Sequence, residues 1–339
     1  MVTFSLCMIV KNESAVLARM LDSVAGLMDE IIIVDTGSTD DTRAIAARYT
    51  DKIYDFEWVD DFAAARNFSF SKATCDYIYA PDADEYVDPE NLERFRVLKE
   101  CMLTEIDIVQ MHYITKAEFN TVENLSDELR PKLFKRLREF VWTDPIHETV
   151  RLTPVVYDSD VCIQHLPQNA HHDRDFGIFL KALKRDGNLS HRIGKMWAKE
   201  LLKCGNLEDL ADAEEYFSGL YYAKDECNIR DEAGCVLARL FRNAGRIPEF
   251  FSVVLSHIVA RNATDTCSEI CYEIGMYFLE AGQKDDAMMW FYNAVRETEP
   301  ILDIGVCRDS ALKLSHIYED MGLTEESLEY QKTAAGYEL

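Results

Sequence analysis

Two aspartates one residue apart, in the run Asp82-Ala83-Asp84-Glu85, are the residues of this 339-residue chain that most directly indicate chemistry. They follow Tyr77-Ile78-Tyr79-Ala80, an apolar run short enough to be a buried strand. Two carboxylates at the end of a strand can hold Mg²⁺ or Mn²⁺, which substrate phosphates often help to coordinate. Acidic side chains repel a bare diphosphate, so the pattern predicts a metal ion between protein and nucleotide. The alternative interpretation is a solvated acidic turn, because such short motifs also arise by chance.

A second acid stands at the end of another expected strand. The apolar segment at 30–35 ends in Asp35, and Gly37 then permits a tight turn. Ser38 or Asp40 can cap the helix that follows, which is the structural interpretation of these two residues. Asp35 differs, because a carboxylate at the open end of a central strand needs a partner. A nucleobase N–H or a ribose hydroxyl would serve.

Further candidates stand later in the chain. Arg66 can pair with phosphate bidentately, although an ion pair with a nearby acid is an equally good interpretation. Glu148 is a candidate general base, with Asp144 as the second choice, and His147 can ligate metal or bind phosphate. His165 ends an expected strand and is a weaker candidate metal ligand. For both histidines a structural role is the alternative.

The elements that must position these residues alternate between strand and helix up to about residue 165. We expect strands over 4–10, 30–35, 52–55, 77–80 and 161–164, and helices over 15–24, 42–49 and 61–73. Such alternation predicts a parallel sheet with helices on both faces. Ligands of such sheets bind beyond the carboxyl ends of the strands, where both Asp35 and Asp82 fall.

From Gly177 onward the pattern becomes helical, and turn glycines recur between apolar helix-like runs. They stand at positions 205, 245, 282 and 322, so their spacings are 40, 37 and 40 residues. This period indicates an α-solenoid of tetratricopeptide-like repeats, with an ordinary helical bundle as the alternative. We therefore expect two domains, residues 1–170 and 171–339, which also agrees with the length of the chain.

Composition excludes several classes of function. The net charge of −25 argues against nucleic acid or anionic lipid as the main partner, since both need cationic patches. No run approaches the roughly 18 apolar residues of a membrane span, and the first residues do not read as a signal peptide. The ten cysteines include no Cys-x-x-Cys, and we interpret them as reduced core residues of a cytoplasmic protein.

Together the motifs of the first half resemble family 2 glycosyltransferases of the GT-A fold, a Rossmann-like α/β fold that binds nucleotide-sugars. The resemblance covers roughly residues 3–165, with segments 5–13, 29–40, 61–67 and 82–85 in matching order and spacing, and 146–148 extends it. It implies that the acid at position 35 contacts the base or ribose, and that the Asp-x-Asp carboxylates bind metal and ribose. With the candidates named above, the expected donor-site residues are Val10, Asn12, Glu13, Asp35, Gly37, Ser38, Arg66, Asp82 and Ala83, and the expected metal-site residues are Asp82, Asp84, His147 and His165.

The activity that the resemblance implies is metal-dependent transfer of a sugar, with inversion, from a nucleotide-sugar to a peptide, protein or glycan. A UDP-sugar is the expected donor, and Glu148, with Asp144 behind it, is the expected base. A family 2 domain followed by helical repeats is also similar to bacterial peptide S-glycosyltransferases. The repeats would present the acceptor or mediate self-association as a homodimer. Four aromatic residues can line their concave face, although helical spacing favours core packing: Tyr216, Phe217, Tyr221 and Tyr222.

Two other functions deserve comparison with this one. A sugar nucleotidyltransferase would share the broad α/β plan, but it needs a Gly-rich basic loop after the first strand to hold a triphosphate. That place holds Lys11-Asn12-Glu13-Ser14, which contains no glycine. A scaffold with an inert first domain is the second alternative, and the intact acidic motif argues against it.

Overall fold

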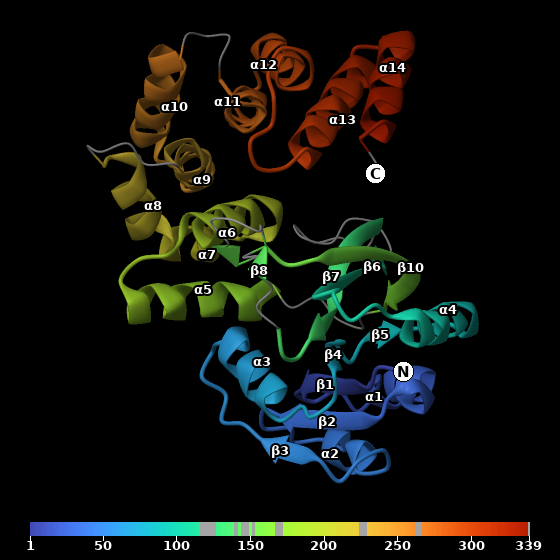
Figure 1. Cartoon of the computed structure of the whole chain (residues 1–339). Coiled ribbons are helices and arrows are strands. Elements are labelled where there is room, and N and C mark those ends of the chain that lie inside the picture. Colours follow the sequence, from blue (N-terminus) through green and yellow to red (C-terminus); the bar gives the residue numbers. More distant parts are fainter. Residues whose placement is uncertain are drawn as a thin grey trace. The chain divides into compact units, whose positions relative to one another are not determined.

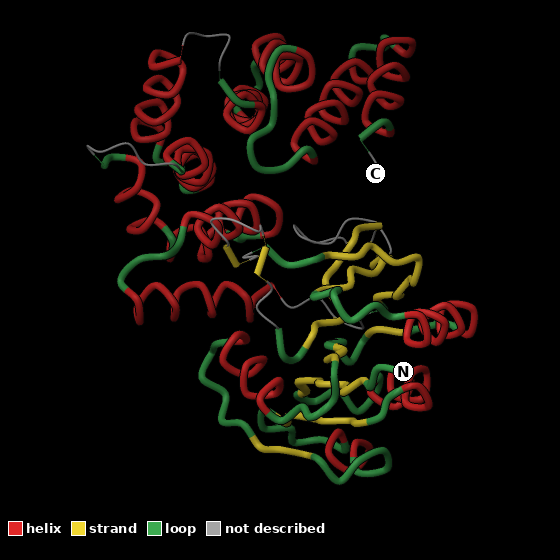
Figure 2. The backbone as a smooth tube through the Cα atoms, viewed as in Figure 1, coloured by secondary structure: helices red, strands yellow, loops and turns green. Residues whose placement is uncertain are grey.

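A mixed β-sheet and a series of helices make up the chain (Figures 1 and 2). The structure is a computed structural model. It describes residues 1–115, 127–138, 142–143, 149–150, 153–166, 172–223, 229–261 and 266–337. The chain divides into two units, Met1–Ala170 and His171–Leu339, which we treat separately. The first unit holds the sheet and the second is helical.

The main sheet of the first unit has eight strands within the described residues, in the order β3-β2-β1-β4-β7-β6-β10-β5. Strands β1 to β4 are mutually parallel where they pair, and β6 pairs in parallel with β10. Strand β7 is antiparallel to both of its neighbours, and β5 is antiparallel to β10. The bounds are β1 Phe4–Val10, β2 Glu30–Asp35, β3 Ile53–Asp55, β4 Tyr77–Tyr79, β5 Glu85–Tyr86, β6 Ile108–Thr115, β7 Asp127–Lys135 and β10 Val156–His165, with a separate antiparallel pair β8 Trp142–Thr143 and β9 Thr149–Val150.

The expectation of a purely parallel sheet is therefore wrong beyond β4. Strands β6 and β7 follow each other in the chain and pair antiparallel, from Ile108 opposite Phe134 to Ile114 opposite Asp127. Neither strand presents the continuous apolar run of a strand buried on both faces; β6 alternates between buried and more exposed positions instead. Because β7 reverses direction, its first half lies at the edge where its parallel neighbours end.

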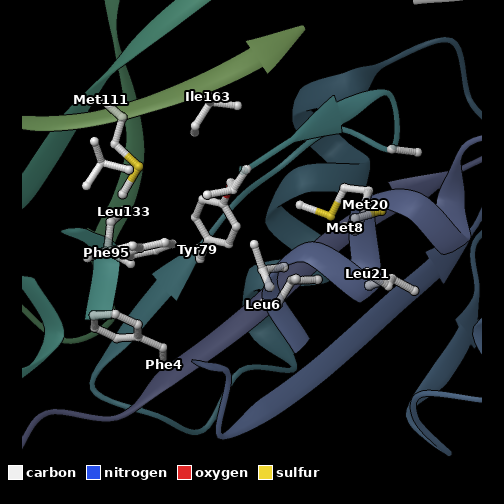
Figure 3. Close-up of a cluster of buried hydrophobic side chains, with 14 of the residues drawn as sticks. Phe4, Leu6, Met8, Met20, Leu21, Tyr79, Phe95, Met111, Leu133 and Ile163 are labelled. Carbon is white, nitrogen blue, oxygen red and sulfur yellow. The ribbon is translucent and has the colours of Figure 1, made fainter. Parts of the chain in front are cut away.

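Helices cover both faces of the sheet, as predicted. The helices are α1 Leu17–Val24, α2 Thr42–Ala46, α3 Phe62–Ser71 and α4 Pro89–Cys101, with a short 3₁₀ turn at Ala25–Leu27. Alternate residues of β1 point to opposite faces. Phe4, Leu6 and Met8 enter the core shared with α1 and α4 (Figure 3), whereas Cys7 packs in a second cluster with Phe68 of α3.

Glu30, at the start of β2, is hydrogen-bonded to three other segments of the first unit. Its buried carboxylate accepts hydrogen bonds from the Lys52 ammonium at 2.6 Å, from Thr74 N at 2.8 Å and Thr74 Oγ1 at 3.0 Å, and from Ser5 Oγ. Burial alone would raise the pKa of Glu30, but these donors lower it from 4.5 to about 2. The charged form of Glu30 therefore stabilises the folded state.

Glu30→Gln is expected to destabilise the first unit by roughly 2–4 kcal/mol, because it leaves buried donors and a cation without their charged partner. Since the folded pKa lies below the unfolded one, this stability is present above about pH 4.5 and is lost as the pH falls toward 2. Thermal unfolding at a series of pH values checks this. Glu93→Gln, which removes an exposed partner of Arg96 on α4, should change the melting temperature little; equal effects of the two substitutions would contradict the argument.

The second unit consists of helices in the described residues. Its core is formed by residues such as Trp197 and Phe217, both at most 1% exposed. Tyr221 is also buried, as helical spacing predicts, whereas Tyr222 is 59% exposed and Tyr216 is partly buried. The helices are α5 His172–Asp186, α6 His191–Cys204, α7 Leu207–Asp212, α8 Glu214–Tyr221, α9 Arg230–Asn243, α10 Ile247–Arg261, α11 Ser268–Glu280, α12 Lys284–Arg296, α13 Gly305–Asp320 and α14 Thr324–Ala335.

Three of the four predicted turn glycines form the same turn. Gly245, Gly282 and Gly322 adopt left-handed φ angles of 68°, 76° and 76°. In each turn the next residue donates its N–H to a carbonyl five residues back, at 2.8 to 2.9 Å, as in a Schellman motif. Gly205 differs, because it is extended, with φ −67° and ψ 133°. The helix pairs α9–α10, α11–α12 and α13–α14 are therefore joined alike, and α6–α7 is not.

Two general expectations can be compared with the described residues. None of their helices is both long and apolar enough to cross a lipid bilayer. The described cysteines are free thiols, but the expectation of core positions holds only for part of them. Buried are Cys7, Cys235, Cys267, Cys271 and Cys307, whereas Cys75, Cys162 and Cys204 are half-buried and Cys101 is exposed.

Candidate active site

The predicted site residues gather at the edge of the sheet where the parallel strands end. Val10 of β1 lies opposite Asp35 of β2, so these two strands end together. Strands β4, β6 and β10 run in the same direction as β1, and the direction of β7 is opposite. The segment 80–85 after β4, the first half of β7 and the end of β10 at His165 consequently reach the same edge. This is the edge at which open α/β sheets bind ligands.

Asp35 already has partners within the chain. Its side chain is nearly buried, and Oδ1 accepts hydrogen bonds from Ser38 N at 3.0 Å and Ser38 Oγ at 2.6 Å. The guanidinium of Arg43 lies 3.7 Å from Oδ2. Ser38 and Arg43 therefore supply partners for the carboxylate that was expected to need one. These contacts fix the orientation of the carboxylate and leave Oδ2 as its less occupied oxygen.

Hydrogen bonds join the loop after β1 to the loop after β2, beside Asp35. Asn12, in a left-handed conformation with φ 56°, donates its N–H to Ser38 Oγ at 3.0 Å and accepts from Thr39 N at 2.8 Å. The N–H of Glu13 donates to Thr42 Oγ1 at 2.7 Å. Gly37 supplies the turn with φ 97°, which residues with a Cβ rarely adopt. The predicted residues of these two loops therefore form one connected structure.

Asp84 and His165, both predicted metal ligands, lie side by side. Oδ2 of Asp84 and Nε2 of His165 are 3.1 Å apart, and both side chains are partly exposed, at 23% and 13%. Nδ1 of His165 lies 3.4 Å from Thr115 Oγ1, and its ring packs against Tyr113. The backbone carbonyl of Asp84 accepts from Leu166 N at 3.0 Å. An imidazole and a carboxylate held in this way have fixed orientations and offer adjacent donor atoms of the kinds that ligate divalent cations.

Asp82 lies between two cations. Its Oδ1 is 3.4 Å from Nη2 of Arg66 in α3, and its Oδ2 is 3.5 Å from Nζ of Lys132 in β7. Burial alone would raise the pKa of Asp82, but Lys132 and Arg66 lower that pKa well below its usual range. Both interpretations of Arg66 thus remain compatible with the structure: it pairs with an acid, and its Nη1 is buried without a hydrogen-bond partner among the described residues. The intervening Ala83 is buried.

Lys132 is a site residue that the sequence analysis missed. It is 5% exposed, and its ammonium also contacts Oε1 of Glu85, which is fully buried. Burial of Lys132 would lower its pKa, but the carboxylates of Glu85 and Asp82 raise it above its ordinary value. Burial raises the pKa of Glu85. No local signal marks Lys132, because the pairing of β7 with β6 shifts register at this residue and the alternation of side chains is interrupted.

Asp144, His147 and Glu148 lie outside the described residues. Their predicted roles, the base for Glu148 or Asp144 and metal or phosphate binding for His147, therefore stay predictions from sequence.

Comparisons with known proteins agree with the resemblance of the first half. Residues 5–151 match the model of the family described as glycosyl transferase family 2. A TPR repeat-containing protein of Synechococcus elongatus is 49% identical over 85 residues, which are 25% of this chain and 21% of that protein. Glycosyltransferase SunS, from the SPbeta prophage of Bacillus subtilis, is 36% identical over 115 residues, 33% of this chain and 27% of that protein. The matches thus span under a third of these relatives' own length.

Among solved structures, part of this chain is similar to glucosyl-3-phosphoglycerate synthase from Mycobacterium tuberculosis in complex with Mn²⁺ and UDP-glucose. The match covers 56% of this chain and 81% of the synthase chain, with 16% sequence identity and a TM-score of 0.39. That similarity is too low to support an inference about ligands. The family match and the observed architecture confirm the predicted fold class, a GT-A-like α/β half followed by helices, and the chain therefore contains a glycosyl transferase family 2 domain.

Proposed function

We propose that the protein is a metal-dependent, inverting glycosyltransferase that moves a sugar from a nucleotide-sugar, with UDP-sugar as the donor class, to a peptide, protein or glycan. The observation that carries the proposal is the Asp84–His165 pair, at 3.1 Å, on the sheet edge that also carries Asp35. The family 2 domain supports glycosyl transfer as the reaction class.

The residues present fit a divalent cation that accepts both oxygen and nitrogen ligands. Asp84 and His165 would hold it, because a carboxylate oxygen and an imidazole nitrogen already converge there and second contacts fix both. When bound, Mg²⁺ or Mn²⁺ supplies positive charge that stabilises the departing diphosphate. Asp82 faces two cations and would reach the metal or the ribose through its less occupied lone pairs.

The protein's own groups would bind and orient the donor. Asp35, held by Ser38, offers Oδ2 to a base N–H or a ribose hydroxyl. Arg66 offers Nη1, a buried donor without a partner among the described residues, to a phosphate oxygen. Displacement at the anomeric carbon passes through an oxocarbenium-like state. A base, assigned to Glu148 with Asp144 as the second choice, takes the proton of the attacking acceptor.

Release of UDP from a panel of UDP-sugars, with Mg²⁺ or Mn²⁺ and with a chelator, tests the proposal. We expect metal-dependent release with at least one sugar, and a rise in melting temperature when donor and metal are added together, because ligand binding to the folded state stabilises it. A folded sample that neither binds any nucleoside diphosphate with metal nor releases UDP would instead support a scaffold with an inert first domain.

Glu148→Gln is expected to keep donor affinity and to lower transfer by roughly 10²–10⁴-fold, because the amide cannot accept the acceptor's proton. Titration of UDP in the presence of metal measures binding, and product formation measures transfer. Asp144→Asn provides the comparison, since the second choice should show the smaller effect. Loss of donor binding in Glu148→Gln would assign this residue to the metal or to the structure instead.

A further inference from the structure

Four side chains that the proposed sugar transfer does not use lie buried in the helical unit. Cys235 belongs to α9 and His257 to α10, while Cys267 and Glu269 stand at the start of α11. Cys235 is 0% exposed and each of the other three is 3% exposed. Burying a carboxylate and an imidazole beside two thiols is unfavourable unless each group has a partner. The cluster therefore gathers four groups that can ligate a metal in one buried place.

Two separations between donor atoms are close to those of ligands around one ion. Sγ of Cys235 and Sγ of Cys267 are 3.5 Å apart, and Sγ of Cys267 is 3.9 Å from Nε2 of His257. One donor atom each from Cys235, Cys267 and Glu269 lies within 4.8 Å of the others, and His257 stands outside this group, beside Cys267. Around tetrahedral zinc, with bonds of about 2.3 Å to sulfur and 2.0–2.1 Å to nitrogen, two sulfurs stand ~3.8 Å apart and a sulfur and a nitrogen ~3.6 Å apart.

Further groups contact the side chains of Glu269 and His257 and orient their donor atoms. Oε1 of Glu269 accepts the backbone N–H groups of Ile301, Leu302 and Asp303 at 3.1, 2.7 and 3.1 Å, whereas Oε2 accepts a bond of 3.2 Å from Ile301. Oε2 therefore keeps more free coordination capacity. Nδ1 of His257 faces Asp231 Oδ1 at 3.9 Å, which directs Nε2 toward Cys267. Carboxylates and backbone groups in such positions hold metal ligands in many sites.

The backbone beside Cys235 lies close to the side chains around this cluster. A Cβ atom on Gly234 would lie 3.4 Å from Nδ1 of His257 and 3.0 Å from the Tyr221 ring. Glycine at this position thus lets α9 approach the Tyr221 ring closely. A Cβ atom there would press on the Tyr221 ring, whereas its distance to the imidazole would be an ordinary contact.

We propose that Cys235, Cys267, Glu269 and His257 form a buried structural site for a thiophilic divalent cation of the zinc class. The ion would join α9, α10 and α11, which belong to two successive helix pairs. Two thiolates and an imidazole suit zinc and exclude Mg²⁺, so this site differs in metal preference from the Asp84–His165 pair. With Nε2 of His257 as the fourth donor the site would be closed, as structural zinc sites are.

The test uses the full chain purified under reducing conditions without chelator. We expect one equivalent of zinc per chain by mass spectrometry of the metal, and Co²⁺ substitution should give the visible absorption of a tetrahedral thiolate complex. The double variant Cys235→Ser/Cys267→Ser should lose both signals. Cys307→Ser is the matched control, because this buried thiol donates to Ala294 O at 3.4 Å, a bond that serine can also make.

A second variant keeps the test decisive if the double variant does not fold. His257→Gln leaves both thiols in place and should weaken zinc binding at least tenfold in a competition with a chromophoric chelator. Wild-type protein that takes up neither Zn²⁺ nor Co²⁺ in reductant would overturn the proposal. So would a native sample in which Cys235 and Cys267 are joined as a disulfide, which would make the pair a redox element.

Discussion

Replacing Asp84 by alanine is expected to lower sugar transfer by roughly a thousandfold or more while the fold survives. Asp84 is the carboxylate that meets His165 at 3.1 Å, and its side chain is 23% exposed, so its removal opens no large core cavity. Loss of a metal ligand removes charge stabilisation of several kcal/mol from the departing diphosphate, and each 1.36 kcal/mol is a factor of ten in rate. Initial rates of UDP release at saturating metal measure the effect.

Asp84→Asn separates charge from shape in the same experiment. Asparagine can still accept a hydrogen bond from His165 but is a weaker ligand, so we expect its activity to fall with that of Asp84→Ala. Asp160→Asn, on the exposed side of β10, is the control that should leave the rate unchanged. Turnover of Asp84→Ala like that of the wild type, with Mg²⁺ or Mn²⁺ present, would remove Asp84 from the site.

The strands that sequence predicts best are those with strong apolar runs and clear turn signals. β1 and β2 have the expected bounds, because they are buried along nearly their whole length. Helix α2 ends at Ala46, three residues before the predicted end. The backbone N–H groups of Arg48 and Tyr49 donate to carbonyls three residues back, which forms tighter turns than an α-helix. Helix α1 begins at Leu17, two residues late, because the Glu13 carbonyl first accepts from Val16 and Leu17 in a turn.

The part of the site that sequence could not predict depends on tertiary pairing. His165 and Asp84 are 81 residues apart, and their contact follows from β10 ending at the same edge as β4. Lys132 stands in a segment with Pro131 and several charged residues, which reads as an exposed strand or loop. The antiparallel pairing of β7 with β4 turns that lysine inward, beside Glu85. No local pattern distinguishes it from a surface lysine.

Lys132→Met is expected to destabilise the first unit by roughly 3–5 kcal/mol, the usual effect of removing one partner of a buried ion pair. Methionine fills a similar volume, so most of the loss reflects the buried Glu85 carboxylate, which is left without its cation. At about 2–4 °C per kcal/mol for a domain of this size, the melting temperature should fall by roughly 10 °C. Lys135→Met is the control, since its ammonium lies in a more exposed position and donates to Thr104 O at 2.7 Å.

A double-mutant cycle shows whether Glu85 is the cause. Glu85→Gln removes the carboxylate that Lys132 neutralises, so Lys132→Met in that background should lose much less stability than in the wild type. Asp82 remains in both backgrounds, and Arg66 still lies 3.4 Å from it, so its charge keeps one cation. A coupling energy near zero would mean that Lys132 acts through Asp82, and through the donor site, rather than through the buried pair with Glu85. Donor titrations of the single variants then separate these roles, because a lysine needed for the phosphates weakens binding even where the fold is intact.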